Sequence, residues 1–266
     1  MIIEVKDVQE GYVKSEKHNH VTTIEFFHPQ GNSLPGKMLA DLAHEIVYAG
    51  NDKTVNVIIL RSAGTGAFCG GASFDELAAI TTEAQGKQFF SGFANVINAM
   101  RKCPKLIIAR IHGKCVGGGV GLAAAADYAI AVEGAEVKLS ELSVGIGPFV
   151  VGPAVERKIG LSAFSQLSID ATHWRNGDWA RRKGLFAELH PTLESMEESI
   201  ERLSNTLAHS SVEAIVELKK VFWKGTEHWD QLLTERAAIS GKLVVSEQSK
   251  HALKKILDAR AKAKAV

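Results

Sequence analysis

The chain has 266 residues, of which 45% are hydrophobic and 23% are charged, and its formal net charge at pH 7 is +1. This length fits one large α/β domain with a small appendage, and the composition is that of an ordinary globular protein. The near-neutral charge gives no reason to expect nucleic acid or an anionic membrane as a partner.

The cellular compartment is predicted from three features. The three cysteines, Cys69, Cys103 and Cys115, form no C-x-x-C pair and are odd in number, which favours free thiols in a reducing compartment. The first ten residues, MIIEVKDVQE, carry charges where a signal peptide needs its apolar centre. No apolar run approaches the roughly 20 residues that span a bilayer. We therefore predict a cytoplasmic location.

The first third of the chain predicts a hairpin, a helix and a strand. Residues 1–35 read as a β-hairpin, with strands over 11–16 and 21–27 and a polar turn over 17–20. Residues 36–50 carry apolar side chains near helical spacing, and 55–60 form a continuous apolar run typical of a buried strand.

The next segment alternates glycine loops with helices and strands. After a loop over 61–71, Ser73 is placed to cap a short helix, with Glu76 at the capping-box spacing. A longer helix over 82–102 ends before Pro104. Strands are predicted over 106–111 and 128–132.

Between those two strands lies the most informative stretch, KCVGGGVGLAAAAD over residues 114–127. It predicts a strand, a tight glycine turn and a buried helix whose first N–H groups have no intrahelical acceptors. An oxyanion placed there would be stabilised by these groups and by the helix dipole. The glycines alone leave a second reading open, in which they only let helix and strand pack closely. The spacing fits neither a P-loop nor a dinucleotide fingerprint.

From Gly152 onward the chain reads as mostly helical. Helices are predicted over 153–159, 162–169 and 177–183, and four more over 192–209, 212–223, 229–244 and 247–263. The aromatic and branched residues after Pro148, namely Phe149, Val150 and Val151, predict a compact apolar pocket wall.

Three motifs together carry a resemblance to a known family. They are AFCGGASFDEL at 67–77, IHGKCVGGGVGLAAAAD at 111–127 and LSELSVGIGP at 139–148. In order and spacing they resemble the enoyl-CoA hydratase/isomerase (crotonase) family, and in motif most of all the bacterial methylglutaconyl-CoA-type hydratases. The resemblance implies an α/β fold, a right-handed spiral of ββα units over 1–191. It also implies a C-terminal helical trimerisation region over 192–266.

The resemblance also implies catalytic residues. Ala72 and Gly118 match the two backbone amides that hold the thioester enolate oxygen, and Glu141 matches the second of the family's two glutamates, an acid/base. The first glutamate aligns with Gly121, which has no side chain, so this chain departs from the two-glutamate hydratases. Without the resemblance, Glu141 would read as an ordinary exposed glutamate. Substrate contacts are implied at Asn32, Ser33, Leu34, Gly71, Ser73, Gly117, Gly121, Gly145, Pro148 and Phe149.

The implied activity is hydration of a 2,3-enoyl-CoA double bond through an oxyanion-stabilised enolate. A Δ3,Δ2-enoyl-CoA isomerase with Glu141 as a single proton shuttle is the alternative, and a catalytically inactive CoA-thioester-binding protein is another. Neither reaction needs a metal or a cofactor besides the coenzyme A of the substrate. The resemblance implies self-association to a trimer or hexamer. The resemblance also implies that one cation of the basic run over 250–264 meets the CoA phosphate, although a solvated helix face is the more ordinary reading of that run.

Overall fold

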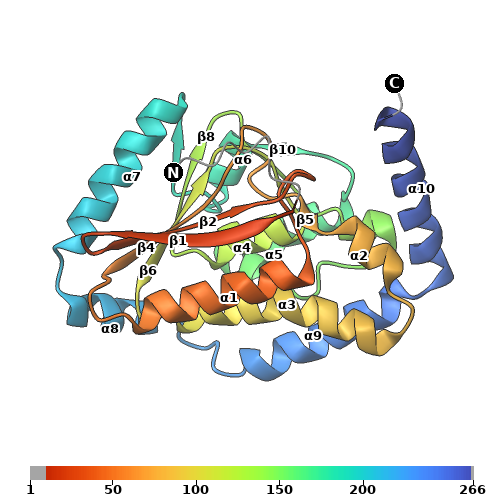
Figure 1. Cartoon of the computed structure of the whole chain (residues 1–266), viewed down its shortest axis with the longest axis horizontal. Helices are drawn as coiled ribbons and strands as arrows, with labels where there is room; N and C mark the ends of the chain where they lie inside the picture. Colours follow the sequence, from red (N-terminus) through yellow and green to blue (C-terminus); the bar gives the residue numbers. More distant parts are fainter. Residues whose placement is uncertain (1–9, 265–266) are drawn as a thin grey trace.

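The structure is a computed structural model that describes residues 10–264, so the first nine residues of the predicted hairpin segment lie outside the described residues. A six-stranded sheet with strand order β1-β2-β4-β6-β8-β11 forms its centre (Figure 1). The first two strands pair antiparallel and every later neighbour pairs parallel. The strands are β1 (Tyr12–His18), β2 (Val21–Phe27), β4 (Val57–Ser62), β6 (Leu106–Ile111), β8 (Tyr128–Val132) and β11 (Glu188–His190).

Most strands of this sheet are followed by a short strand outside it and then by a helix. The short strands are β3 (Ser33–Leu34), which pairs with β5 (Gly71–Ala72), and β7 (Cys115–Val116), which pairs with β9 (Glu136–Lys138). A further short strand, β10 (Arg175–Asn176), pairs with β9. The helices are α1 (Gly36–Asn51), α2 (Phe74–Ala79), α3 (Glu83–Lys102), α4 (Gly118–Ala125), α5 (Gly152–Ile169) and α6 (Gly177–Arg182). This repeat confirms the predicted α/β fold of ββα units.

The central strand β6 is buried along its whole length because both faces of the sheet are covered. Ile107, Ala109 and Ile111 point into the main core with α1, α3, α4 and α5. Ile108 points to the opposite face and packs in a second cluster with Met196. The alternation of side chains along a strand therefore divides one apolar run between two cores.

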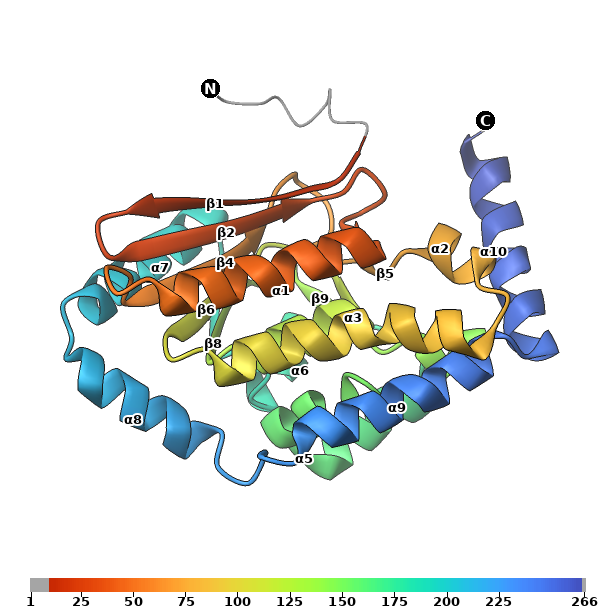
Figure 2. The same cartoon turned by 60° about the horizontal axis from the view of Figure 1, so that its bottom comes forward.

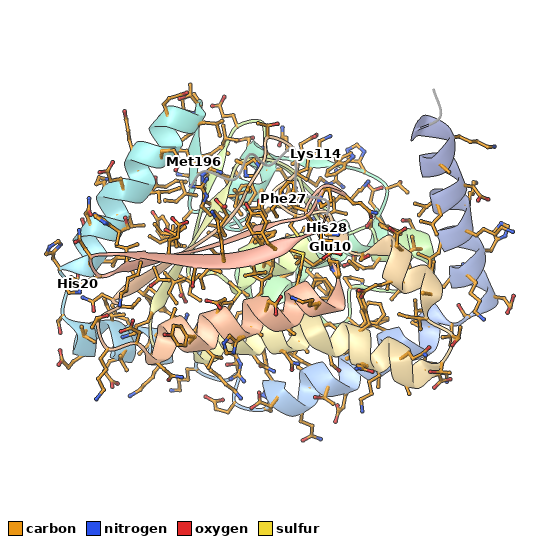
Figure 3. The ribbon with its side chains drawn as sticks, in the orientation of Figure 1. Glu10, His20, Phe27, His28, Lys114 and Met196 are labelled. Atoms are coloured by element: carbon orange, nitrogen blue, oxygen red, sulfur yellow. The ribbon has the colours of Figure 1, made fainter. Side chains whose placement is uncertain are left out.

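The C-terminal helices pack against this same chain. Met196 belongs to α7 (Leu193–Ala208), which covers the outer face of the sheet (Figure 3). The next helix, α8 (Val212–Phe222), leads to α9 (Trp229–Val244), which runs along α3 (Figure 2). A Cβ atom on Gly86 of α3 would lie 2.7 Å from Gly241 Cα, so the two backbones are in contact. Within the part of the chain described, no helix has both the length and the hydropathy to cross a membrane.

The last helix, α10 (Glu247–Lys264), packs against α2 and against a short 3-10 turn, η2 (Glu141–Val144). A Cβ atom on Gly145 would lie 2.6 Å from Ser249 Oγ, which shows how closely helix and turn approach. Leu233 of α9 and Leu253 of α10 are buried in the main core with residues of the spiral. The predicted boundary between 191 and 192 falls in the turn between β11 and α7, and it stays a prediction.

Two predicted elements are shifted in the structure. The hairpin turn is two residues shorter than predicted, because His18 pairs directly with Val21. Asn19 has a φ of 53° there, a conformation that asparagine tolerates well and that tight hairpins require. The strand predicted over 55–60 runs over 57–62, because its ends are set by pairing with β2 and β6 and not by the apolar run. Val55 instead donates its N–H to Asp52 O in the preceding turn.

Candidate active site

The glycine stretch forms the turn and the helix start that the sequence predicts. Gly117, with a φ of 51° and a ψ of −112°, precedes α4, and its carbonyl accepts the N–H of Val120 at 2.9 Å. Helix α4 is buried along its whole length. Its first N–H, that of Gly118, belongs to the turn that has no intrahelical acceptor. This amide lies at the wall of a pocket.

The second predicted amide lies on the neighbouring strand β5. Ser73 N donates to Leu34 O at 3.3 Å, and successive N–H groups of a strand point to opposite sides. The Ala72 N–H therefore points away from β3. A Cβ atom on Gly71, whose φ is 83°, would lie 3.4 Å from Gly118 N. The structure thus brings the segments of Ala72 and Gly118 side by side, and both residues line the same pocket.

Glu141 faces these segments from η2. A Cβ atom on Gly117 would lie 3.0 Å from Glu141 Oε1 and 3.6 Å from Oε2, so the carboxylate rests against the Gly117 backbone. Its Oε2 atom is buried and has no hydrogen-bond partner within the described residues. Burial raises the pKa of this carboxyl group to about 7. A carboxylate with such a pKa exchanges protons readily near neutral pH.

Gly121, which aligns with the first of the two glutamates discussed above, has no room for a side chain. Gly121 lies on α4, and a Cβ atom there would come within 2.5 Å of Val151 Cγ1. Any side chain on Gly121 would meet Val151 before it reached the pocket. Gly118 is similarly covered by the ring of Phe93. Among the described residues that line the pocket, Glu141 is therefore the single carboxylate.

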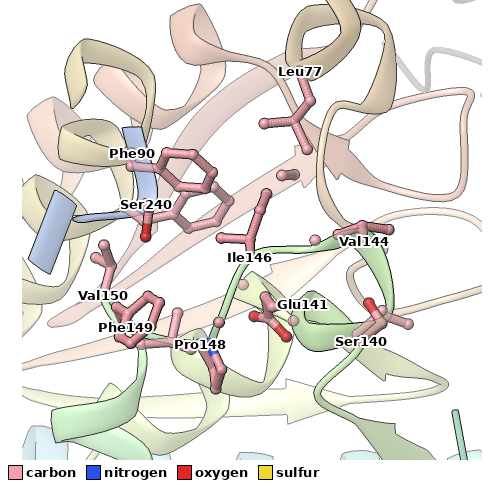
Figure 4. Close-up of a pocket in the computed structure, with 18 of the residues that line it drawn as sticks. Leu77, Phe90, Ser140, Glu141, Val144, Ile146, Pro148, Phe149, Val150 and Ser240 are labelled. Atoms are coloured by element: carbon pink, nitrogen blue, oxygen red, sulfur yellow. The ribbon is translucent and has the colours of Figure 1, made fainter. Parts of the chain in front are cut away.

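The pocket itself holds about 560 Å³ of space, part of it open to solvent, and its wall is almost entirely apolar (Figure 4). Phe149, Val150 and Val151 contribute to it, which confirms the predicted apolar wall. The side chains of Ser140, Glu141 and Ser240 supply its polar groups. The lining residues are Gly70, Gly71, Ala72, Phe74, Leu77, Phe90, Phe93, Val116, Gly117, Gly118, Ser140, Glu141, Val144, Ile146, Gly147, Pro148, Phe149, Val150, Val151 and Ser240.

Some predicted contact residues lie outside this lining. Asn32 is buried, and its amide nitrogen donates to Ala63 O at 2.9 Å and to Ala67 O at 2.8 Å, so the side chain fastens its own loop. Ser33 and Leu34 are buried in β3. Ser73 caps α2 by accepting the N–H of Glu76 at 3.4 Å, as predicted. The remaining two are Gly121 and Gly145, which pack against Val151 and Ser249 as described above.

Sequence reasoning missed the contributions of α2, α3 and α9 to the pocket. Phe90 and Phe93 of α3 lie three residues apart, and this helical spacing of aromatic side chains was a usable signal. Ser240 of α9 carried no such signal.

The cysteines add no nucleophile, since burial raises the pKa of Cys69 to about 12 and that of Cys115 well above its ordinary value. Within residues 10–264, no group of His, Cys, Asp and Glu could hold a metal ion.

Comparison with known proteins decides the family. The model of the enoyl-CoA hydratase/isomerase family matches residues 16–264. The chain belongs to this family. This member shares 33% identity over 159 residues with the mitochondrial methylglutaconyl-CoA hydratase of Mus musculus, covering 59% of this chain and 50% of the mouse protein. It therefore spans about half the length of that relative.

Other relatives of this family member match along nearly the whole chain. The short-chain-enoyl-CoA hydratase of Clostridium acetobutylicum is 26% identical over 248 residues, which is 92% of this chain and 94% of that protein. The crystal structure of an enoyl-CoA hydratase from Bacillus halodurans superposes with a TM-score of 0.84 at 23% identity, and covers 92% of this chain and 99% of that one. At that identity the likeness establishes the shared fold.

Proposed function

We propose that this family member hydrates the double bond of a 2,3-enoyl-CoA thioester, with Glu141 as the acid/base. The observation that carries the proposal is the buried Glu141 carboxylate, whose Oε2 atom has no hydrogen-bond partner among the described residues and whose pKa is about 7, facing the segments of Ala72 and Gly118 in an apolar pocket. The hydratases among its relatives support the same reaction.

In this proposal the amides of Ala72 and Gly118 bind the thioester oxygen. Glu141 accepts a proton from water as the water oxygen forms a bond to C3, and the electrons of the double bond move onto the thioester oxygen as an enolate. The enolate then takes the proton from Glu141 at C2, which regenerates the carboxylate. Each oxyanion donor of this kind is typically worth about 2.7–4 kcal/mol in the transition state.

A second candidate is Δ3,Δ2-isomerisation, and the packing of Val151 against Gly121 favours it. That contact leaves one carboxylate in the pocket, and one carboxylate suffices to move a proton between C2 and C4 of the acyl chain. Water addition also needs a place for the water, and the apolar wall offers few polar groups to hold it.

The two reactions separate when the enzyme is incubated with crotonyl-CoA and with a 3-enoyl-CoA, and the products are identified by mass. Hydration adds the mass of water, whereas isomerisation leaves the mass unchanged and moves the double bond. We expect the hydrated product from crotonyl-CoA. Isomer conversion without any hydration would contradict the hydratase proposal and support the isomerase. Tight thioester binding without reaction on any substrate would support a binding protein.

A further inference from the structure

Ser240 places a hydroxyl group in a mostly apolar wall, whose other polar side chains among the described residues are those of Ser140 and Glu141. The residue is 1% exposed, lies on α9 and lines the pocket. Its side-chain oxygen lies apart from the Glu141 carboxylate (Figure 4). In the described part of the chain this hydroxyl makes no hydrogen bond. The residue borders the pocket, so a bound ligand with an oxygen atom at that point would pair with the hydroxyl, whereas a ligand that covers it without such an atom would leave it unsatisfied.

The position of Ser240 is fixed by the close crossing of two helices. The next residue, Gly241, is in backbone contact with Gly86 of α3, which holds α9 against the helix that carries Phe90 and Phe93. The hydroxyl is therefore presented to the pocket by a rigid crossing and not by a loop. Such a group discriminates between ligands, because a ligand without a matching oxygen leaves it unpaired.

The same pocket has no counterion for a charged acyl group. Among the described residues, none of those that line it is Lys, Arg or His. A carboxylate on the acyl chain would be buried without a cation, and it would repel Glu141. Burying an unpaired charge is strongly unfavourable.

Resting on the proposed acyl-CoA function, we propose that the acyl group is uncharged and carries a hydrogen-bonding oxygen toward its far end, which Ser240 binds. A hydroxyl and a ketone share this chemistry, since the serine hydroxyl both donates and accepts. A dicarboxylic acyl group, such as the methylglutaconyl group in the name of the mouse relative, is excluded by the same wall.

The test uses 2-enoyl-CoA probes of equal chain length that differ in one group: a terminal methyl, a hydroxyl or ketone scanned along the chain, or a terminal carboxylate. For wild-type enzyme we expect kcat/KM for the best oxygenated probe to exceed that of the methyl probe about 5- to 30-fold, as one buried hydrogen bond allows. The carboxylate probe should fall about 100-fold or more below the oxygenated one.

Ser240→Ala should remove the preference for the oxygenated probe, so that kcat/KM for the oxygenated and methyl probes becomes equal. Ser204→Ala is the matched control, because Ser204 is also a buried serine of a C-terminal helix but lies outside the pocket lining. Ser240→Cys, which keeps the shape and weakens the hydrogen bond, serves if the alanine variant does not fold. Equal kcat/KM for oxygenated and methyl probes, an unchanged ratio in Ser240→Ala, or a preference for the carboxylate would overturn the inference.

Dissociation constants of the saturated analogues separate this inference from the proposed reaction. These analogues have no double bond to react, so their affinities report on Ser240 even if no probe turns over. We expect the saturated oxygenated analogue to bind about 5- to 30-fold more tightly than the methyl analogue in wild type, and equally in Ser240→Ala. Such binding without turnover would reject the reaction and retain the acyl specificity. Turnover without the affinity difference would support the proposed reaction and reject the proposed acyl specificity.

Discussion

A Cβ atom on Gly121 would lie 2.5 Å from Cγ1 of Val151, so the side chain of one residue occupies the space that a side chain on the other would need. The glycine and the valine therefore act as a pair. Val151 fills the space that a carboxylate side chain at position 121 would need. Replacing Gly121 alone would therefore not restore a second acid.

This pair predicts a double-mutant cycle. Gly121 has helical geometry, so Gly121→Ala alone would ordinarily stabilise a helix by about 0.5–1 kcal/mol. Here we expect it to destabilise by about 1–3 kcal/mol through overpacking. Adding Val151→Ala should recover part of this loss. Urea unfolding of the four proteins measures the coupling, and strictly additive effects would show that the two residues are independent.

Removing the acid/base group gives the second prediction. Glu141→Gln keeps the size of the side chain but cannot accept a proton at neutral pH, so we expect turnover to fall at least about 10²–10⁴-fold. Affinity for CoA thioesters should change little, because the amides of Ala72 and Gly118 are untouched. Steady-state kinetics and calorimetric titration measure the two effects. Glu133→Gln, at an exposed glutamate, is the control, and near wild-type turnover in Glu141→Gln would refute the assignment.

The raised pKa of Glu141 also links stability to pH. The folded state holds this proton up to a pH of about 7, whereas the unfolded chain releases it near its ordinary value of 4.5. The native state therefore binds more protons between these values, and its stabilising contribution is lost as pH rises through 7. Glu141→Gln should be more stable than wild type at pH 8, by at most about 3 kcal/mol, and should differ little at pH 4. Thermal unfolding across this range checks the sign, and an opposite trend would show that the carboxylate is solvated or paired.

The fourth prediction concerns the ion pair of Lys219 with Asp127. These side chains are 4% and 5% exposed and 2.5 Å apart, and Asp127 also accepts the indole N–H of Trp223 at 3.1 Å. Asp127→Asn should destabilise the fold by about 3–5 kcal/mol, because it leaves the lysine charge buried without its counterion. The exposed pair of Lys220 with Glu217 is the control, and Glu217→Gln should cost less than about 1 kcal/mol. Equal losses of unfolding free energy in the two variants would contradict this.

The fifth prediction concerns assembly. Many apolar residues of the C-terminal helices are buried within the subunit, among them Ile200, Ile215 and Leu233. Val221 and Phe222 of α8 remain 67% and 47% exposed. We expect a trimer or hexamer in solution, with this apolar surface covered by a neighbouring subunit. Light scattering at micromolar concentration tests the expectation, and a stable monomer of about 28.7 kDa would refute it.

A substitution at Val221 tests whether α8 lies in that interface. Val221→Lys would place a charge on the exposed apolar face, and we expect it to lower the mass measured by light scattering. Glu133→Lys changes a charge at an exposed position outside α8 and should leave the mass unchanged. Dissociation by neither variant would place the interface elsewhere on the chain.

The sequence predicted those features that depend on local chemistry. The strand over 106–111 and the cap at Ser73 follow from apolar runs and short-range hydrogen bonding, and both were found where predicted. The family resemblance predicts Ala72, Gly118 and Glu141 as members of one site, and all three line the same pocket in the structure. The strand and the cap could be predicted because neighbouring residues determine them, whereas the three site residues were predicted from the family resemblance.

Features that depend on long-range packing escaped prediction. The pairing of Val57 with Val21 and Leu106 fixed the start of β4, and no local pattern encodes that register. Ser240 enters the pocket because Gly241 meets Gly86 from a helix more than a hundred residues away. The contact of Val151 with Gly121 likewise could not be predicted, because no local pattern shows which residue approaches that glycine. Distant contacts of this kind are set by the whole fold.

The crossing of Gly86 with Gly241 places the residue proposed to recognise the acyl group on a different part of the chain from the residues proposed to react with it. The residues assigned to bond making and breaking lie on β5, at the start of α4 and on η2, whereas the hydroxyl assigned to the far end of the acyl group lies on α9. Substitutions on α9 can therefore alter which molecules are accepted while the reacting centre is conserved. Both glycines are required for this arrangement. A larger residue at either one would push α9 away from α3 and so move Ser240 away from the proposed catalytic residues.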